Sequence, residues 1–193
     1  LVNAPEISGV TSYSQLTSTT SKLSDNTIYS MVMEGETDLE IDATMSVTIP
    51  VSRLAAKVVI KQIVNNFELP THQNMEFSVT AIYLVNVAGE KSYLSSSVPT
   101  LWYNKMMVDR EDGSSPDFTY DFFQNPNKIP YPGTFTTDKY FYCYPNPAED
   151  DCFDSVWSER YTRIVVEATL GGETVYYPIS LPEVKQNTVY EVT

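Results

Sequence analysis

The stretch Ser-Arg-Leu-Ala-Ala-Lys-Val-Val-Ile-Lys-Gln-Ile, residues 52–63, decides how the rest of the chain is organised. Its first half is compatible with a helix, but its second half is an apolar run of strand length flanked by lysines. The β-branched residues of this run are Val58, Val59, Ile60 and Ile63. Because β-branched side chains favour strands, we predict a buried strand here.

Pro50 marks a boundary just before this strand. Proline lacks the N–H that a central strand needs, and it disfavours helix in the residue that precedes it. We therefore expect one sheet to end near Pro50 and another to begin after it. The break favours two domains, although a single sandwich of this length would also be ordinary.

Composition narrows the class of protein and its partners. With 193 residues, of which 42% are apolar, the chain can bury one large core or two small ones. It has 25 acidic and 12 basic residues, a net charge of -13, and no cluster of Lys or Arg. Nucleic acid and anionic membrane surfaces are disfavoured as partners, because both require such a cluster. No run of 18 apolar residues exists, so no membrane-spanning helix is expected.

Both ends of the sequence look like parts of strands. Leu-Val-Asn-Ala-Pro at residues 1–5 reads as the end of a strand, and residues 188–193 stop in mid-alternation. The pattern at the two ends predicts a fragment or a trimmed product.

The first 50 residues predict one short helix and several strands. Ser12 and Gln15 have the spacing of a capping box, which predicts one or two helical turns within residues 12–23. Apolar and polar residues then alternate with the period of a strand, which predicts a meander of three strands. These strands are expected at residues 27–33, 38–42 and 45–49.

The rest of the chain also has strand patterns, interrupted by a long irregular insertion at about residues 95–137. Gly171 and Gly172 supply the positive backbone angles of a tight hairpin between two of the strands. The strands are expected at residues 76–85, 139–144, 162–170, 174–181 and 187–192. The chain is therefore expected to be all-β, with long loops, at most one short helix and sandwich packing.

Four segments of the sequence resemble the fimbrillin, or type V pilin, family of Bacteroidales. The first is residues 1–5 together with Tyr-Ser-Met-Val-Met-Glu-Gly at 29–35, and the second is Ser-Arg-Leu-Ala-Ala-Lys-Val-Val-Ile at 52–60. The third is Phe-Ser-Val-Thr-Ala-Ile-Tyr-Leu-Val-Asn at 77–86 with Lys-Ser-Tyr-Leu at 91–94. The fourth comprises Tyr-Cys-Tyr-Pro-Asn-Pro at 142–147, Tyr-Tyr-Pro-Ile at 176–179 and Asn-Thr-Val-Tyr at 187–190. Their order and spacing cover nearly the whole chain.

The resemblance implies two β-sandwich domains of transthyretin-like topology. Residues 1–52 would be the remnant of an N-terminal domain without its opening strands, and residues 53–193 a C-terminal domain without its closing strands. The resemblance further implies export as a lipoprotein, proteolytic removal of an N-terminal strand, and polymerisation by donation of a strand into the exposed groove. Because the family supplies its donor strand from segments outside residues 1–193, this chain departs from the family pattern at both ends.

The two cysteines, Cys143 and Cys152, are candidates for a disulfide bond. In an exported protein they could close a loop of about ten residues, which would stabilise the fold by roughly 2.5–3 kcal/mol. The alternative is two unpaired thiols. A zinc site is not expected, because His72 is the only histidine and there is no second pair of cysteines.

No catalytic signature stands out. His72 lies in a loop-like sequence with no nucleophile motif near it, so we expect a locally bonded or exposed histidine. The acidic segments at residues 109–113 and 149–151, with Asp154 nearby, lack the spacing of an EF-hand, and solvated loop charge is expected in place of calcium binding. We therefore expect no enzyme activity, no metal and no cofactor.

The sequence thus predicts a structural subunit of a cell-surface fimbria on the outer membrane, which polymerises with other fimbrial subunits by β-strand donation and supports adhesion. The alternative is a carbohydrate-binding β-sandwich surface module that stacks exposed aromatic residues on sugar rings. Its candidate residues are Trp102, Tyr103 and Trp157. Aromatic residues of this kind also fill sandwich cores and fix long loops.

Overall fold

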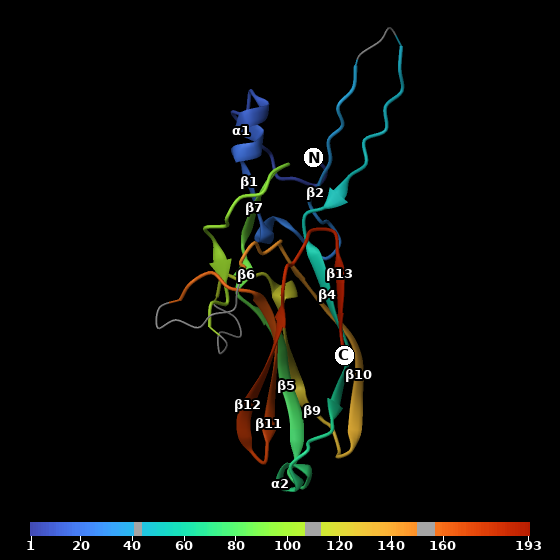
Figure 1. Cartoon of the computed structure of the whole chain (residues 1–193), viewed down its shortest axis with the longest axis vertical. Coiled ribbons are helices and arrows are strands. Elements are labelled where there is room, and N and C mark those ends of the chain that lie inside the picture. The colour runs from blue at the N-terminus through green and yellow to red at the C-terminus, as the bar shows by residue number, and fades with distance from the viewer. Residues whose placement is uncertain (41–43, 107–112, 150–156) are drawn as a thin grey trace.

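The computed structural model describes residues 1–40, 44–106, 113–149 and 157–193. The predicted all-β class is confirmed. The chain forms an elongated molecule with its N-terminal elements at one end and α2 at the other (Figure 1). The helices are α1 (Tyr13–Ser18) and α2 (Pro70–Gln73), with 3-10 turns η1 (Leu23–Asp25) and η2 (Asp117–Thr119). None of the helices within the described ranges is long and apolar enough to cross a membrane.

The strands fall into a short group of two to four residues and a long group of nine to eleven residues. The short strands are β1 (Thr20–Lys22), β2 (Met33–Glu34), β3 (Ser52–Arg53), β6 (Val87–Ala88), β7 (Glu90–Ser92), β8 (Trp102–Tyr103) and β13 (Val189–Val192). The long strands are β4 (Ala56–Asn65), β5 (Phe77–Val85), β9 (Tyr120–Lys128), β10 (Gly133–Cys143), β11 (Thr162–Leu170) and β12 (Glu173–Leu181).

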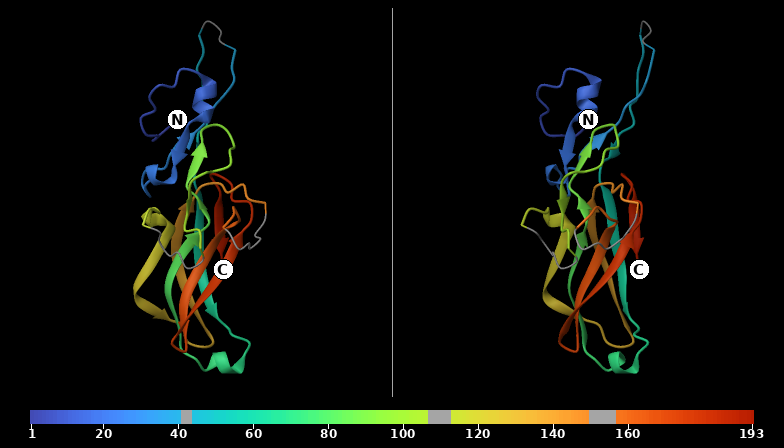
Figure 2. Two further views of the ribbon diagram at one scale, coloured as in Figure 1. Left: turned by 90° about the vertical axis from the view of Figure 1, so that its left-hand side faces the viewer. Right: turned by 60° about the vertical axis from the view of Figure 1, so that its left-hand side comes forward.

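One β-sandwich forms the body of the molecule. A three-stranded sheet of order β10-β4-β13 faces a four-stranded sheet of order β12-β11-β5-β9 (Figure 2). The predicted strand in residues 52–63 is confirmed: β4 is the central strand of the smaller sheet, antiparallel to β10 and parallel to β13. The predicted hairpin is also confirmed, because Gly171 and Gly172 have φ angles of 60° and 92° between β11 and β12.

The core lies between the two sheets and follows the period of two that each strand imposes. Val58 and Ile60 of β4 meet Ile164 and Val166 of β11 in one buried cluster. The same cluster includes Leu23, Met31 and Val32, which precede the expected domain boundary. The two segments therefore pack together, and their division at residues 52 and 53 stays a prediction because packing alone does not show whether each folds by itself.

The predicted meander of residues 27–49 is wrong for the residues that the structure describes. Thr27 and Ser30 close a tight turn by two backbone hydrogen bonds of 3.1 Å, and β2 begins only at Met33. Residues 36–40 and 44–51 are extended but belong to no strand. The strands that flank them, β2 and β3, pair with each other. Residues 36–40 and 44–51 project from the body in all three views, and we call them the arm (Figures 1 and 2). Residues 41–43, which include the predicted inward-facing Ile41, lie outside the described ranges.

Other expectations are only partly met. Ser12 caps α1 by accepting from the backbone N–H of Gln15 at 3.2 Å, so the predicted helix is confirmed at one to two turns. The second helix, α2, was not expected. The insertion at residues 95–137 contains the nine-residue strand β9. This strand pairs with β5, so β5 is a central strand of its sheet.

Candidate functional site

The predicted disulfide partners have different status in the structure. Cys143 ends β10 in the sandwich core with no exposed surface, and burial raises the pKa of its thiol to about 12. Cys152 lies outside the described residues. The disulfide between Cys143 and Cys152 therefore stays a prediction.

The aromatic residues proposed to stack on sugars are not exposed platforms. Trp102 and Tyr103 form β8 and are 5% and 4% exposed. Trp157 is half-buried, meets Trp102 edge-on with ring centroids 5.6 Å apart, and donates its indole N–H to Asn86 Oδ1 at 3.2 Å. The prediction that these rings are exposed is wrong for Trp102 and Tyr103, because they fill the space between loops and the core.

The remaining polar candidates form no cluster in the described part of the chain. His72 lies on α2 and contacts Phe67 edge-on at 5.7 Å between ring centroids. No group of three or more metal-ligating side chains occurs within the described ranges. Of the two acidic segments, residues 109–112 and 150–151, and Asp154, lie outside those ranges.

The sandwich is open along one side of β4. On that side, β13 pairs with β4 only from Lys57 to Ile60. On the other side, β10 continues its pairing with β4 as far as Asn65. Within the described residues, β4 therefore presents an unpaired backbone edge at residues 61–65.

An apolar groove of about 290 Å³ lies beside this free edge. Its walls come from both sheets: Ile60 and Ile63 from β4, Tyr177 and Ile179 from β12, and Val192 from β13. Ile179 is 39% exposed, which is unusual for an isoleucine that faces the interior of a sandwich. We call this site the β4–β12 groove. It combines unpaired backbone groups with apolar walls, which is the geometry that receives an additional strand.

The far wall of the groove is itself an edge strand. In the order β12-β11-β5-β9, β12 pairs only with β11. Its Pro178 has no N–H to offer, and proline in strands is largely confined to edges. The groove is thus bordered by one edge that can bond a new strand and one edge that is partly blocked.

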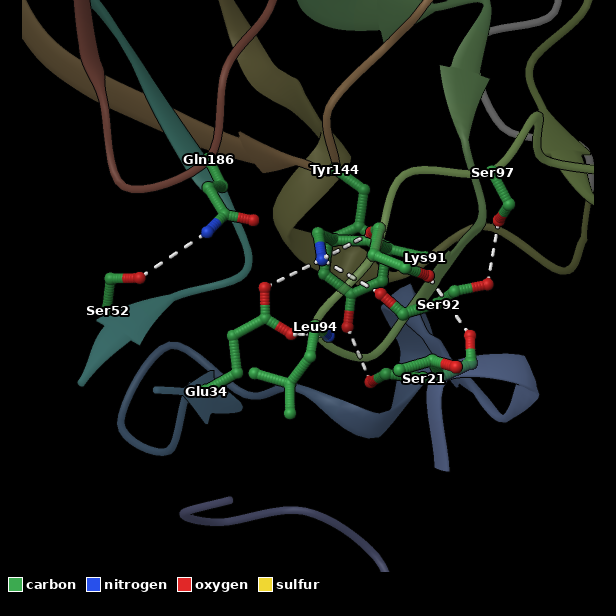
Figure 3. Close-up of polar contacts among 11 residues, drawn as sticks. Ser21, Glu34, Ser52, Lys91, Ser92, Leu94, Ser97, Tyr144 and Gln186 are labelled. Atoms are coloured by element: carbon green, nitrogen blue, oxygen red, sulfur yellow. Dashed lines mark hydrogen bonds and ion pairs between the residues drawn. The ribbon is translucent and has the colours of Figure 1, made fainter. Parts of the chain in front are cut away.

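A buried ion pair holds the N-terminal segment against the body above the groove. Lys91 Nζ of β7 lies 2.8 Å from Glu34 Oε1 of β2, and the two side chains are 11% and 7% exposed. Glu34 Oε2 also accepts from the backbone N–H of Leu94 at 2.7 Å, and Lys91 donates to Ser92 O at 2.8 Å (Figure 3). Because both charges have several partners, this contact is well satisfied for a buried pair.

Tyr144 makes a second attachment of the N-terminal segment. Its hydroxyl lies 2.7 Å from Ser21 Oγ (Figure 3). It also accepts from Asn26 Nδ2 at 2.8 Å. Burial raises the pKa of Tyr144 to about 12, so the phenol is neutral and can donate as well as accept. The side chain links the end of β10 to β1 and η1.

The groove could not be predicted from the sequence, because its residues come from strands that are far apart in the chain. Two local signals could have indicated it. Pro178 interrupts the alternation of β12 and so marks an edge strand, and Ile179 follows it directly. The pairing of β4 with β10 and β13 depends on contacts between residues that are far apart in the chain.

Comparison with known proteins adds the fold class to this geometry. No protein-family model and no curated protein matches the chain. Two solved structures, each of a candidate cell adhesion protein from Parabacteroides distasonis ATCC 8503, are similar in fold. The first has a TM-score of 0.66 at 13% identity, over 95% of this chain and 62% of that chain. The second has a TM-score of 0.54 at 16% identity, over 93% and 66%.

These identities show a shared fold and nothing finer. The chain spans less than two thirds of the first of these proteins. The similarity agrees with the all-β fold that the fimbrillin resemblance implies, and membership of that family stays a prediction.

Proposed function

We propose that this chain is a structural part of a cell-surface adhesion protein and is assembled with other subunits by β-strand addition. The observation that carries the proposal is the unpaired edge of β4 at residues 61–65, which lies beside an apolar groove. An extended segment of a neighbouring subunit would bond to this edge through its backbone. Its alternate side chains would fill the β4–β12 groove.

The fold supports this role without defining it. The two structures of similar fold are named as candidate cell adhesion proteins, which is consistent with an exported surface protein. An open apolar edge also favours association, because an uncovered strand edge readily pairs with another chain. The proposed location is the outside of the cell, in a fimbria on the outer membrane.

We also propose that the role is structural and that the protein has no catalytic activity. The single histidine, His72, packs against Phe67, and the buried polar groups described above serve to attach segments to one another. These contacts position strands, and the β4–β12 groove is open to a partner.

The experiment that tests the proposal uses the full-length protein and a substitution in the groove. After treatment with a trimming protease, the wild-type protein is expected to give ladders on denaturing gels run without boiling. Ile179→Lys places a charge in the groove at a partly exposed position and is expected to abolish the ladder while the subunit stays folded.

Val98→Lys is the matched control, because Val98 is 60% exposed and does not line the groove. It is expected to leave the ladder unchanged. A folded wild-type protein that stays monomeric after trimming, or an Ile179→Lys variant that polymerises normally, would contradict assembly through this groove.

A further inference from the structure

A second pocket, also of about 290 Å³, lies on the outer face of the three-stranded sheet. The extended stretch at residues 53–57 gives this pocket Arg53, Ala55 and Lys57, because residues two apart in an extended chain share a face. Across the ladder, Tyr142 of β10 and Val189 of β13 are the register partners of Lys57. The pocket therefore has two cations separated by a small side chain, with a tyrosine beside them.

Arg53 and Lys57 bring two cations together in a chain whose net charge is -13. Five lysines elsewhere are in ion pairs with carboxylates, namely Lys61, Lys91, Lys128, Lys139 and Lys185. Within the described residues, neither Arg53 nor Lys57 has a carboxylate partner. The Lys57 ammonium lies 4.2 Å from the centroid of the Tyr140 ring, a contact that leaves its charge uncompensated.

The pocket thus concentrates positive charge on an acidic protein. The charge of Arg53 also acts to lower the pKa of Tyr142, although burial outweighs it and the pKa is raised overall. An arginine fork can bond a carboxylate through two parallel N–H donors.

Tyr29 forms the rim of the pocket and is 93% exposed. It lies with Ile28 at the corner of the turn that the two Thr27–Ser30 backbone hydrogen bonds close. This turn holds a large ring in water beside the cations. A tyrosine ring combines an apolar face with a polar tip, so it suits a ligand that has an apolar ring face and hydroxyl groups.

Polar side chains complete the wall opposite the tyrosines. Asn187 Oδ1 accepts from the backbone N–H of Arg53 at 3.4 Å, and Thr188 donates its hydroxyl to Gln186 O at 3.1 Å. Both residues line the pocket. The Asn187 amide N–H₂ and the Thr188 hydroxyl oxygen can therefore meet hydroxyl groups of a ligand.

We propose that this pocket binds a carboxylate-bearing sugar, such as a uronic or sialic acid unit of a glycan. The cations would pair with the carboxylate, the Tyr29 ring would cover the apolar face of the sugar, and Asn187 and Thr188 would bond its hydroxyl groups. A peptide of acidic residues alone would use the cations but has no ring face for Tyr29, so the geometry favours the sugar acid. The pocket lies on the outer face of the sheet and shares no residue with the β4–β12 groove.

This inference goes beyond the proposed assembly, because it concerns what a subunit binds. It can therefore be tested on the monomer before any trimming or polymerisation. Failure of the sugar experiment would leave strand addition intact, and failure of the ladder experiment would leave the pocket intact.

The test is a titration of the full chain, followed by NMR, with methyl glucuronide and methyl glucoside. These probes differ only at C6, which is a carboxylate in the glucuronide and a hydroxymethyl group in the glucoside. The glucuronide is expected to bind at least about tenfold more tightly, because charge-assisted hydrogen bonds are the strong ones, and its affinity should fall with salt. Arg53→Gln is expected to remove this preference, and Tyr29→Ala to weaken the binding of both sugars.

Two variants provide matched controls. Lys22→Gln removes an exposed cation and Tyr13→Ala an exposed tyrosine, both outside the pocket, and neither should change binding. Equal affinity for the two sugars, no binding of either, or an unchanged affinity in Arg53→Gln would overturn the proposal. A Glu-rich peptide that binds more tightly than the glucuronide would also overturn it and would assign the pocket to a protein partner.

Discussion

The sandwich body and the arm contain the same kind of sequence pattern but have opposite environments. Leu84 of β5 is fully buried between two neighbouring strands, whereas Leu39 of the arm is 42% exposed. Met45, Val47 and Ile49, which the alternation places on one face, are each 43–50% exposed. Alternation therefore shows which face of an extended segment is apolar, and it does not show what covers that face.

The base of the arm shows where the two regions join. Gly35 approaches Pro50 so closely that a Cβ at position 35 would lie 2.0 Å from the Pro50 carbonyl oxygen. Only glycine permits this approach of two backbones. Glu34 is the residue before Gly35, and its ion pair with Lys91 attaches the base of the arm to the body.

The largest difference between the regions is expected for one substitution made in both. Leu84→Ala should destabilise the protein by about 4 kcal/mol, because it leaves a cavity between the sheets. Leu39→Ala should cost less than about 0.5 kcal/mol, because the side chain is already partly in water. Urea unfolding of both variants checks this. Similar losses in the two would mean that the arm is packed in solution.

The ion pair at the junction is expected to have the next largest effect. Lys91→Met leaves the Glu34 carboxylate buried without its cation, which should destabilise the fold by about 3 kcal/mol. Lys128→Met breaks an exposed pair with Glu76 and should cost under about 1 kcal/mol. Chemical unfolding gives the two values, and limited proteolysis should show earlier cleavage of the N-terminal segment in Lys91→Met only. Equal losses of stability in the two variants would contradict the role of the Glu34–Lys91 pair as a buried attachment.

Tyr144→Phe tests the second attachment and should have a smaller effect. Loss of the hydroxyl removes the buried partner of Ser21 Oγ and one of the hydrogen bonds of Asn26 Nδ2, which should cost roughly 1.5 kcal/mol. The matched control is Tyr13→Phe. The Tyr13 hydroxyl donates to Glu36 Oε2 at 2.7 Å in an exposed position. Thermal unfolding of the two variants measures the difference, and a larger loss in Tyr13→Phe would reverse the assignment of body and arm.

The smallest effect concerns the pH dependence of the body. Hydrogen bonds from the Thr100 hydroxyl, and from the backbone N–H groups of Thr100 and Leu101, lower the pKa of Glu90 below 4.5. A lowered pKa means that the folded state favours the carboxylate, so this stability is complete above about pH 4.5 and is lost as the pH falls through the folded pKa. Glu90→Gln should reduce the acid sensitivity of urea unfolding. Glu173→Gln, at the exposed hairpin, should leave it unchanged.

The sequence predicted those parts of the fold that local chemistry determines. The β11–β12 hairpin follows from two adjacent glycines between alternating strands, and β4 follows from its β-branched run. Strand β9 could not be predicted, because Gln124, Asn125 and Pro126 disfavour strands and only pairing with β5 holds them extended. The arm was mispredicted for the converse reason, since its pattern is typical of strands but the described residues offer it no second strand.

The candidate sites also combine residues whose proximity can be read from the sequence with residues that only the fold brings together. Arg53 and Lys57 share a face by spacing that can be read from the sequence, whereas Tyr29 joins them only through a turn 24 residues earlier in the chain. The β4–β12 groove is lined by residues of β4, β12 and β13, which only tertiary packing brings together. Spacing within one strand was therefore predictable, and contacts between strands were not.

The central claim is that the free edge of β4 receives a strand from another subunit. Hydrogen exchange of the full-length protein, measured before and after assembly, tests it most directly. The account predicts that the amides of β4 residues 61–65 that point away from β10 become protected on assembly, while those at the outer edges of β9 and β10 do not change. Protection that appears at β9 or β10 and leaves residues 61–65 exchanging as in the monomer would contradict it.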